Sequence, residues 1–340
     1  MNVATFCRQS RVLIVAGKGG VGKTTITAAL AKMASSAGLE VLVVELEGKP
    51  GVPAAFGHEG TLDYDETVLE DLSGDARVRA RRITPDDALV EYLSEHGMKR
   101  ISKRLVSSGA LDVVATAIPG IRDILVLGKV KSLERDDPSD LILVDAPATG
   151  HAMTFLSSAK GLLDAARSGP VRTQAADVVE LLSDSKRCQV ALVTLPEEMP
   201  VSEVVETAYQ LEDRIGITLG PVIVNGCLSE EPLLDTDPAD AAAQAGIDLD
   251  DAQAAALRAA AAFRSHRYRL QSEQWDRLAQ ELPLPQLRAP FLFSPRIGRE
   301  ELERLGADLA AAIEHLEEPQ FEDPEPEARP DPEQSAEPAS

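Results

Sequence analysis

The run from Gly17 to Thr25, Gly-Lys-Gly-Gly-Val-Gly-Lys-Thr-Thr, limits the fold of this chain more than any other segment. It fits the pattern Gly-x-x-x-x-Gly-Lys-Thr, with Gly22, Lys23 and Thr24 in its last three fixed positions. In such a loop the glycines let backbone N–H groups curl around phosphates, the lysine reaches the β- and γ-phosphates, and the threonine hydroxyl ligates Mg²⁺. We therefore predict an ATP and Mg²⁺ site here, formed by Gly17, Gly19, Gly20, Val21, Gly22, Lys23, Thr24 and Thr25.

The sequence around the loop supplies the strand and the helix that this motif requires. Residues 11–17 form a continuous apolar run, typical of a strand buried on both faces. Residues 21–37 predict a helix that ends at Gly38, and residues 39–46 predict a second buried strand. Similar strands are expected at 141–145, 190–195 and 221–225 and near 287–293, with helices at 173–186, 202–215 and 298–316. This alternation predicts an α/β fold with a doubly wound, mostly parallel sheet, of the P-loop nucleotide-hydrolase type.

Three stretches depart from this alternation. Residues 85–135 and 238–282 look helical and are too long for simple crossovers, so we interpret them as helical insertions in one ATPase domain over 1–316. Residues 317–340 hold nine acidic residues and six prolines. Such a composition cannot bury enough apolar surface to offset the entropy of ordering, so this tail is expected to be disordered.

Charge and cysteine content narrow the functional classes. The net charge of −22 repels nucleic-acid phosphates and anionic lipids, so we expect neither a nucleic-acid partner nor membrane association. The three cysteines are far apart in the sequence and form no C-x-x-C pair, which favours a reducing compartment. We see no signal peptide and no apolar run of the ~20 residues that would span a bilayer, so a cytoplasmic location is expected.

A second lysine in the loop, Lys18, points to one subgroup of P-loop proteins. The run Lys-Gly-Gly-Val-Gly-Lys-Thr-Thr resembles the deviant phosphate loop of dimeric ATPases. Residues 41–57, 145–151, 118–123 and 222–225 resemble, in turn, the first switch, the second switch, a helical-subdomain segment and the adenine-contacting strand of one family. That family comprises the arsenical pump-driving ATPases and the tail-anchored-protein targeting ATPases, and the resemblance spans about residues 11–316.

The resemblance implies roles for single residues. Lys18 would reach the nucleotide of a partner subunit, Asp145 would hold Mg²⁺ through water, and Asn225 would contact adenine. Glu47 stands where the family has the aspartate that orients the attacking water, so slow hydrolysis, or hydrolysis only in a complex, is expected to be possible. Glu45 and Glu47 both end the second strand, and only one of them is expected to face the nucleotide; the resemblance favours Glu47.

The residues alone support part of this assignment. A carboxylate at the end of a buried strand, such as Asp145, can hold a Mg²⁺-bound water without being buried unpaired. Asn225 and Asn2 are the only asparagines, so the Asn-Lys-x-Asp guanine motif is absent and adenine is favoured.

Other features of the family do not transfer. Residues 85–135 contain no cysteine for arsenite and one methionine, so neither a metalloid site nor a Met-rich client groove is predicted; the zinc C-x-x-C pair is also missing.

Two functions stay open. One is a homodimeric or heterodimeric ATPase that acts as a nucleotide-driven switch on a protein or small-molecule client. The other is a weakly hydrolysing scaffold that pairs with a homologous subunit. A DNA- or membrane-partitioning ATPase is disfavoured by the acidic tail.

Overall fold

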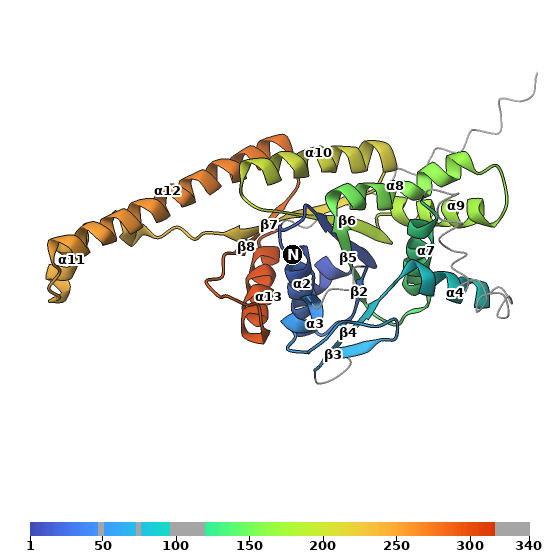
Figure 1. The fold of residues 1–340 in the computed structure, drawn as a ribbon, viewed down its shortest axis with the longest axis horizontal. Coiled ribbons are helices and arrows are strands. Elements are labelled where there is room, and N and C mark those ends of the chain that lie inside the picture. Colours follow the sequence, from blue (N-terminus) through green and yellow to red (C-terminus); the bar gives the residue numbers. More distant parts are fainter. Residues whose placement is uncertain (47–50, 73–75, 96–119, 317–340) are drawn as a thin grey trace, which may run out of the picture.

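A computed structural model describes residues 1–46, 51–72, 76–95 and 120–316. Within these residues an eight-stranded sheet has helices on both faces (Figure 1). The strand order is β3-β4-β2-β5-β1-β6-β7-β8, and the pairs are parallel except for β3 with β4. The strands are β1 (Val12–Gly17), β2 (Glu40–Glu45), β3 (Thr67–Asp71), β4 (Arg77–Arg82), β5 (Leu141–Ala148), β6 (Cys188–Thr194), β7 (Leu219–Cys227) and β8 (Gln286–Pro290). The predicted doubly wound α/β sheet is therefore confirmed.

The helices form two layers (Figure 1). One layer holds α2 and α13, and the other holds α7 to α10 and the root of α12. The helices in the described ranges are α1 (Val3–Cys7), α2 (Lys23–Ser36), α3 (Gly51–Ala55), α4 (Pro85–Glu95), α7 (Ile121–Asp136), α8 (Thr149–Ala165), α9 (Pro170–Ser183), α10 (Glu198–Ile215), η1 (Pro232–Asp235, a 3₁₀ turn), α11 (Pro238–Ala245), α12 (Asp251–Glu281) and α13 (Arg299–Glu314).

The central strand β1 carries no polar side chain because both of its faces are covered. In β1, Val12 and Ile14 pack into the core beneath one helix layer, while Leu13 and Val15 pack into the core beneath the other. Each fully buried side chain of this size stabilises the fold by about 1.5–3 kcal/mol relative to its exposed state. This double burial fixes β1 in the middle of the sheet, with the phosphate loop at its carboxyl end.

The hairpin of β3 and β4 was not predicted from the sequence. β4 reads Arg-Val-Arg-Ala-Arg-Arg, which has the strand period of two but carries arginines at most positions. Val78 and Ala80 are fully buried, whereas Arg79 and Arg81 point to the opposite face of the strand. The arginines are accommodated because acidic side chains pair with them there. Residues 67–82 thus add two strands before the predicted helical stretch begins.

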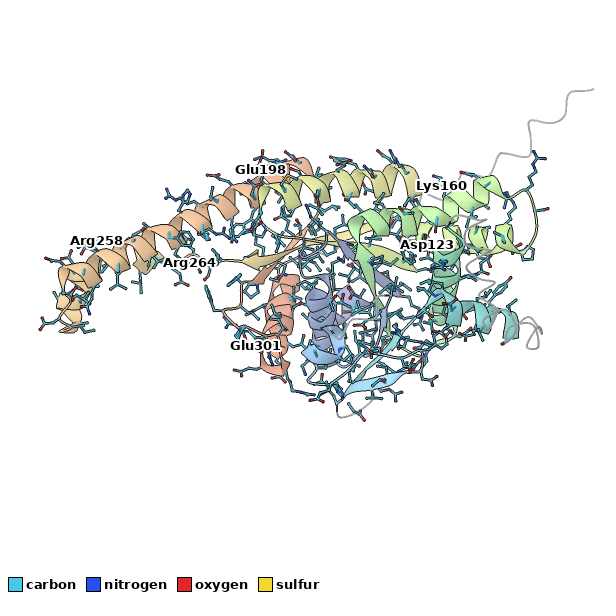
Figure 2. The ribbon with its side chains drawn as sticks, in the orientation of Figure 1. Asp123, Lys160, Glu198, Arg258, Arg264 and Glu301 are labelled. Carbon is cyan, nitrogen blue, oxygen red and sulfur yellow. The ribbon has the colours of Figure 1, made fainter. Side chains whose placement is uncertain are left out.

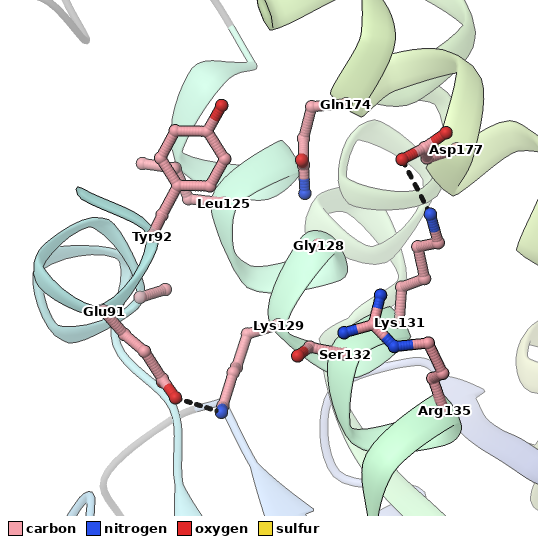
Figure 3. A pocket seen from close by; sticks show the side chains of 11 residues that line it. Glu91, Tyr92, Leu125, Gly128, Lys129, Lys131, Ser132, Arg135, Gln174 and Asp177 are labelled. Atoms are coloured by element: carbon pink, nitrogen blue, oxygen red, sulfur yellow. Dashed lines mark hydrogen bonds and ion pairs between the residues drawn. The ribbon is translucent and has the colours of Figure 1, made fainter. Parts of the chain in front are cut away.

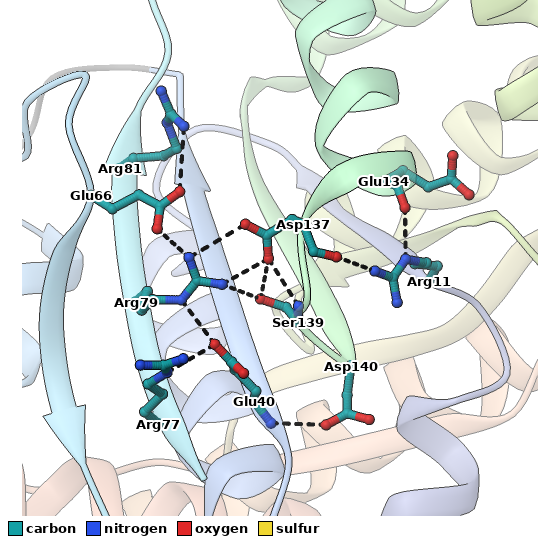
Figure 4. Close-up of polar contacts among 10 residues, drawn as sticks. All are labelled: Arg11, Glu40, Glu66, Arg77, Arg79, Arg81, Glu134, Asp137, Ser139 and Asp140. Carbon is teal, nitrogen blue, oxygen red and sulfur yellow. Dashed lines mark hydrogen bonds and ion pairs between the residues drawn. The ribbon is translucent and has the colours of Figure 1, made fainter. Parts of the chain in front are cut away.

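Arg79 is the centre of a polar network at the amino edge of the sheet (Figure 4). Its guanidinium donates to Asp137 at 2.7 Å, to Ser139 at 2.9 Å and to Glu40 at 3.1 Å, and it also pairs with Glu66. Burial disfavours the charged carboxylate, but hydrogen bonds from Ser139 and Arg79 outweigh it and hold the pKa of Asp137 below its ordinary value. The network joins β4, β2 and the start of β5, far from the phosphate loop at the other edge.

The segment between β7 and β8 projects from the body as an arm. After β7 the chain runs through η1 and α11 and then returns along α12, whose 31 residues span about 46 Å. In Figure 1 the α11 end of this segment lies well away from the sheet. The prediction that residues 238–282 are helical holds for α11 and α12, which are separated by Gly246 to Asp250.

Candidate functional site

The phosphate loop lies between β1 and α2, as the sequence predicts. β1 ends at Gly17 and α2 begins at Lys23, so residues 18–22 arch over the first turn of the helix. A Cβ on Gly17 would lie 2.3 Å from the carbonyl oxygen of Val193, and Gly22 has a φ of 90°. These positions admit only glycine, because other side chains would clash or be strained there. The helix therefore presents its positive end to the cavity of the loop.

Lys23, Thr24 and Asp145 meet beneath this loop. The Lys23 ammonium donates to the carbonyl oxygen of Lys18 at 3.1 Å, and this bond folds the side chain back along the loop. The Thr24 hydroxyl donates to Asp145 Oδ2 at 2.7 Å. Asp145 lies within β5, which continues to Ala148, rather than at the strand end. The hydroxyl and carboxylate that the sequence predicts for Mg²⁺ thus lie side by side.

Glu45 adds a second carboxylate to this region. It is the last residue of β2, it pairs in register with Asp145 on β5, and its side chain is only 1% exposed. Its Oε1 accepts the Val52 N–H at 3.2 Å, while its Oε2 is buried and has no hydrogen-bond partner within the described residues. Burial, together with the negative charge of Asp145, raises the pKa of Glu45 to about 7.

The structure therefore brings Glu45 to the site, whereas Glu47, which the sequence favoured, lies outside the described residues. The start of α3 closes over the same place. A Cβ on Gly51 would lie 2.4 Å from the Thr24 methyl group, so the backbone of Gly51 packs directly on Thr24. The backbone N–H of the next residue, Val52, donates the hydrogen bond to Glu45. The carboxylates of Glu45 on β2 and Asp145 on β5, together with the start of α3, thus surround the Thr24 side chain.

Lys18 makes an ion pair within its own chain. Its ammonium contacts Glu203 on α10, and its side chain is 40% exposed. Both partners are within reach of solvent, so the pair is worth at most about 1 kcal/mol. Such a weak contact can be exchanged for a phosphate oxygen at little cost.

Asn225 lies near the end of β7 and against the phosphate loop. Its side-chain amide donates to the carbonyl oxygen of Val21 at 2.9 Å. A Cβ on Gly22 would lie 2.3 Å from the Asn225 Nδ2 atom, so the two residues are in close contact. This contact fixes the end of β7 to the phosphate loop.

The residues present fit a Mg²⁺–nucleotide complex. Mg²⁺ in such sites takes one or two protein ligands, and its other ligands are phosphate oxygens and water. Thr24 would be such a ligand, Asp145 would hold the ion directly or through water, and Glu45 Oε2, which has no hydrogen-bond partner among the described residues, could accept from a metal-bound water. Within the described residues no group of three or more His, Cys, Asp or Glu side chains is arranged to hold a metal by itself.

A separate cavity of about 200 Å³ lies among α4, α7 and α9 (Figure 3). Lys129 and Lys131 line it, but each forms an ion pair, with Glu91 and Asp177 respectively, both at 2.7 Å. Their charges are therefore compensated inside the fold, and the cavity contains none of the residues of the phosphate loop.

Comparison with known proteins decides the family. Residues 10–167 match the family model described as anion-transporting ATPase. The chain is 36% identical over 256 residues to ATPase BagA of Mycobacterium tuberculosis, an alignment that covers 73% of this chain and 74% of that protein. The chain belongs to the anion-transporting ATPase family. The matched residues include the phosphate loop, Glu45 and Asp145, so the site described above is that of a family of nucleotide-dependent ATPases.

Other members of the anion-transporting ATPase family are similar over smaller shares of their length. A putative arsenical pump-driving ATPase of Halobacterium salinarum is 27% identical over 323 residues, which cover 88% of this chain and 44% of that protein. ATPase get3 of Schizosaccharomyces japonicus is 30% identical over 145 residues, 43% of each chain. The family that the sequence resembles is therefore confirmed. In the described part of this chain, no helix combines the length and apolar character needed to cross a membrane.

Proposed function

We propose that this protein is a Mg²⁺-dependent ATP hydrolase that works as a dimer and acts as a nucleotide-driven switch on a client. The observation that carries the proposal is the contact of Thr24 with Asp145 beneath the glycine loop. It joins the loop after β1 to the neighbouring strand β5 at the point where a metal would bridge protein and phosphates. Mg²⁺ bound there would neutralise charge on the β- and γ-phosphates.

The residues around that point have separable tasks. Lys23 would leave the carbonyl oxygen of Lys18 and pair with phosphate oxygens, while the N–H groups at the start of α2 hold the phosphates in place. Asn225 would hold the base beside the loop, which favours ATP over GTP in the absence of an Asn-Lys-x-Asp motif. Glu47 would orient the attacking water, as the family resemblance implies.

The dimer in this proposal rests on Lys18. Lys23 already serves the phosphates of its own chain, so the second lysine is free to act on the nucleotide of a facing subunit. Its weak, half-exposed pair with Glu203 would be given up when the partner's γ-phosphate arrives. A positive charge delivered in trans stabilises charge on the transferring phosphoryl group, as an arginine finger does.

The client is proposed to be a protein or a small molecule other than a thiol-bound metalloid. Relatives carry the name arsenical pump-driving ATPase, but the three cysteines here, Cys7, Cys188 and Cys227, are all buried on separate elements. Burial raises the pKa of each thiol to about 12. Buried thiols of this kind do not offer the exposed thiolate cluster that a soft ion would need.

The test is steady-state hydrolysis of ATP with and without Mg²⁺, with GTP as the competing substrate. The parent chain should release phosphate from ATP only with Mg²⁺, and Lys23→Ala should not release it. Lys160→Ala, which removes an exposed lysine of α8, is the matched control and should behave like the parent. Equal turnover of Lys23→Ala and the parent would contradict the proposal.

A weakly hydrolysing scaffold is the second candidate, and the glutamate at position 47 favours it. The longer side chain moves the water-orienting oxygen by about 1 Å, and such a displacement can cost about 100-fold in rate. Glu47→Asp separates the two candidates. A large gain in turnover would favour the scaffold, whereas unchanged or lower turnover would favour the switch.

A further inference from the structure

The arm, which we define as residues 228–270, leaves the body at the edge where the phosphate loop lies. β1 and β7 run in the same direction in the sheet, so Gly17 and Cys227 end their strands at the same edge. The phosphate loop begins at the first of these ends, and the arm begins at the second. A subunit that faces the phosphate loop across this edge must therefore meet the arm.

The arm carries apolar side chains that no described part of its own chain covers. Leu233 is 83% exposed, Ile247 59%, Leu257 48% and Phe263 68%. Between residues 255 and 270 of α12 no residue is buried, whereas Gln271, Trp275 and Leu278 are buried where the helix joins the body. A helix with no buried residue over about four turns that yet carries large exposed apolar residues is typical of an interaction surface.

Charge divides the arm into two halves of opposite sign. Residues 228–251, which form the outward limb and the tip, include eight acidic residues and no Lys or Arg. Residues 252–272, which form the returning shaft, include four arginines and no acidic residue. Figure 2 shows Arg258 and Arg264 along this shaft. Within one chain, Arg258 already reaches across to Asp237 at 2.7 Å, so the two halves attract each other.

We propose that the arm pairs in antiparallel fashion with the arm of a second copy of this chain, the acidic tip of each lying on the basic shaft of the other. This inference rests on the dimer of the proposed function, because a two-fold axis that runs across the arms of facing subunits places the arms in opposite directions. A parallel arrangement would place acid on acid. A partner of one charge sign would match only half of the arm, whereas a second copy matches both halves.

The composition of the shaft suits such a crossing. If Asp248 of one copy lies beside Arg269 of the other, the two helices cross midway between these positions, near Ala259. Residues 254–262 are alanine except for Leu257 and Arg258, so the helix axes can approach closely there. Leu257 and Phe263 then fit against the small residues of the partner and lose their exposure to water.

A charge exchange tests the pairing on the full chain. One variant carries Arg267→Glu and Arg269→Glu on the shaft, and the other carries Asp240→Lys and Asp248→Lys near the tip. None of the four side chains belongs to the phosphate site or caps a helix. Dimerisation with Mg²⁺ and ATP is followed by analytical ultracentrifugation, and ATP affinity is measured in the same samples. Glu206→Lys with Glu212→Lys on α10 is the matched control.

The dimer of each variant alone should be at least about tenfold weaker than that of the parent. In each variant, the attraction between tip and shaft becomes repulsion at both of the symmetry-related contacts. An equimolar mixture of the two should recover mixed dimers, and the four changes combined in one chain should recover the homodimer. ATP affinity and the control should stay at parent values. If the parent dimerises with ATP but both variants do so equally well, the pairing is wrong and the proposed function stands. If the parent stays monomeric with ATP at every concentration, both are wrong.

Discussion

Replacing Glu45 with Gln should make the nucleotide-free protein more stable at high pH. The ionised side chain is buried beside Asp145, and one of its oxygens has no hydrogen-bond partner in the part of the chain that the structure describes. Glutamine has nearly the same shape, can still accept the Val52 N–H, and carries no charge. The substitution therefore removes a charge penalty while it keeps the packing.

The raised pKa of Glu45 sets both the sign and the size of this effect. It is about 7 in the folded chain and 4.5 in the unfolded reference, so the folded state holds the proton more tightly. The free energy of unfolding is then highest below the unfolded value and falls as the pH rises from 4.5 to about 7. A difference of this size corresponds to about 3 kcal/mol, an upper limit because nearby side chains can relax.

Urea unfolding in EDTA, without nucleotide, measures this difference. At about pH 5 Glu45 is protonated in the folded chain, so parent and E45Q should unfold with free energies within about 1 kcal/mol of each other. At about pH 8.5 E45Q should be the more stable by about 2–3 kcal/mol. Glu206→Gln, an exposed change on α10, should show no such pH dependence. A constant difference between E45Q and the parent across this range would refute the reasoning.

Four further substitutions, one of them a control, test other parts of the structure. Lys23→Ala should weaken ATP binding by about 10- to 100-fold in calorimetry, since a charge-assisted contact is lost. Gly22→Ala should lower both melting temperature and ATP affinity because its Cβ meets Asn225, whereas Gly38→Ala, with a φ of 86° but open space, should lower only the melting temperature. Arg79→Ala should cost about 3 kcal/mol in urea unfolding, because it leaves the buried Asp137 carboxylate without its cation, and a loss below 1 kcal/mol would contradict the network.

The phosphate loop and the central strands could be predicted because their signals are local. Residues 12–17 are apolar at every position and are followed by a glycine pattern that only a strand, turn and helix satisfy. The hairpin of β3 and β4 could not be predicted in this way. The arginines of β4 resemble a solvated loop until Asp137, about 60 residues further on, is known to pair with them.

The residues of the candidate site were likewise predictable where a local motif marks them, and not where a long-range contact places them. Lys23, Thr24 and Asp145 follow from motif and strand position, and the structure brings the last two together at 2.7 Å. The place of Glu45 could not be chosen from sequence, because Glu45 and Glu47 are two residues apart and the strand period of two puts both on the same face. Its burial against Asp145 depends on the pairing of β2 with β5, which is a long-range contact. The projection of α12 away from the body is likewise invisible in an alanine-rich helical pattern.

The most direct test of the account mixes two inactive variants, Lys18→Ala and Lys23→Ala. If Lys18 serves the facing subunit, a mixed dimer has one complete site, in which Lys23 comes from the first variant and Lys18 from the second. ATP hydrolysis should then return to about a quarter of the parent rate, since half of randomly formed dimers are mixed and each has one of two sites intact. Mixed dimers without any recovery of hydrolysis, or a Lys18→Ala chain as active as the parent, would contradict the account.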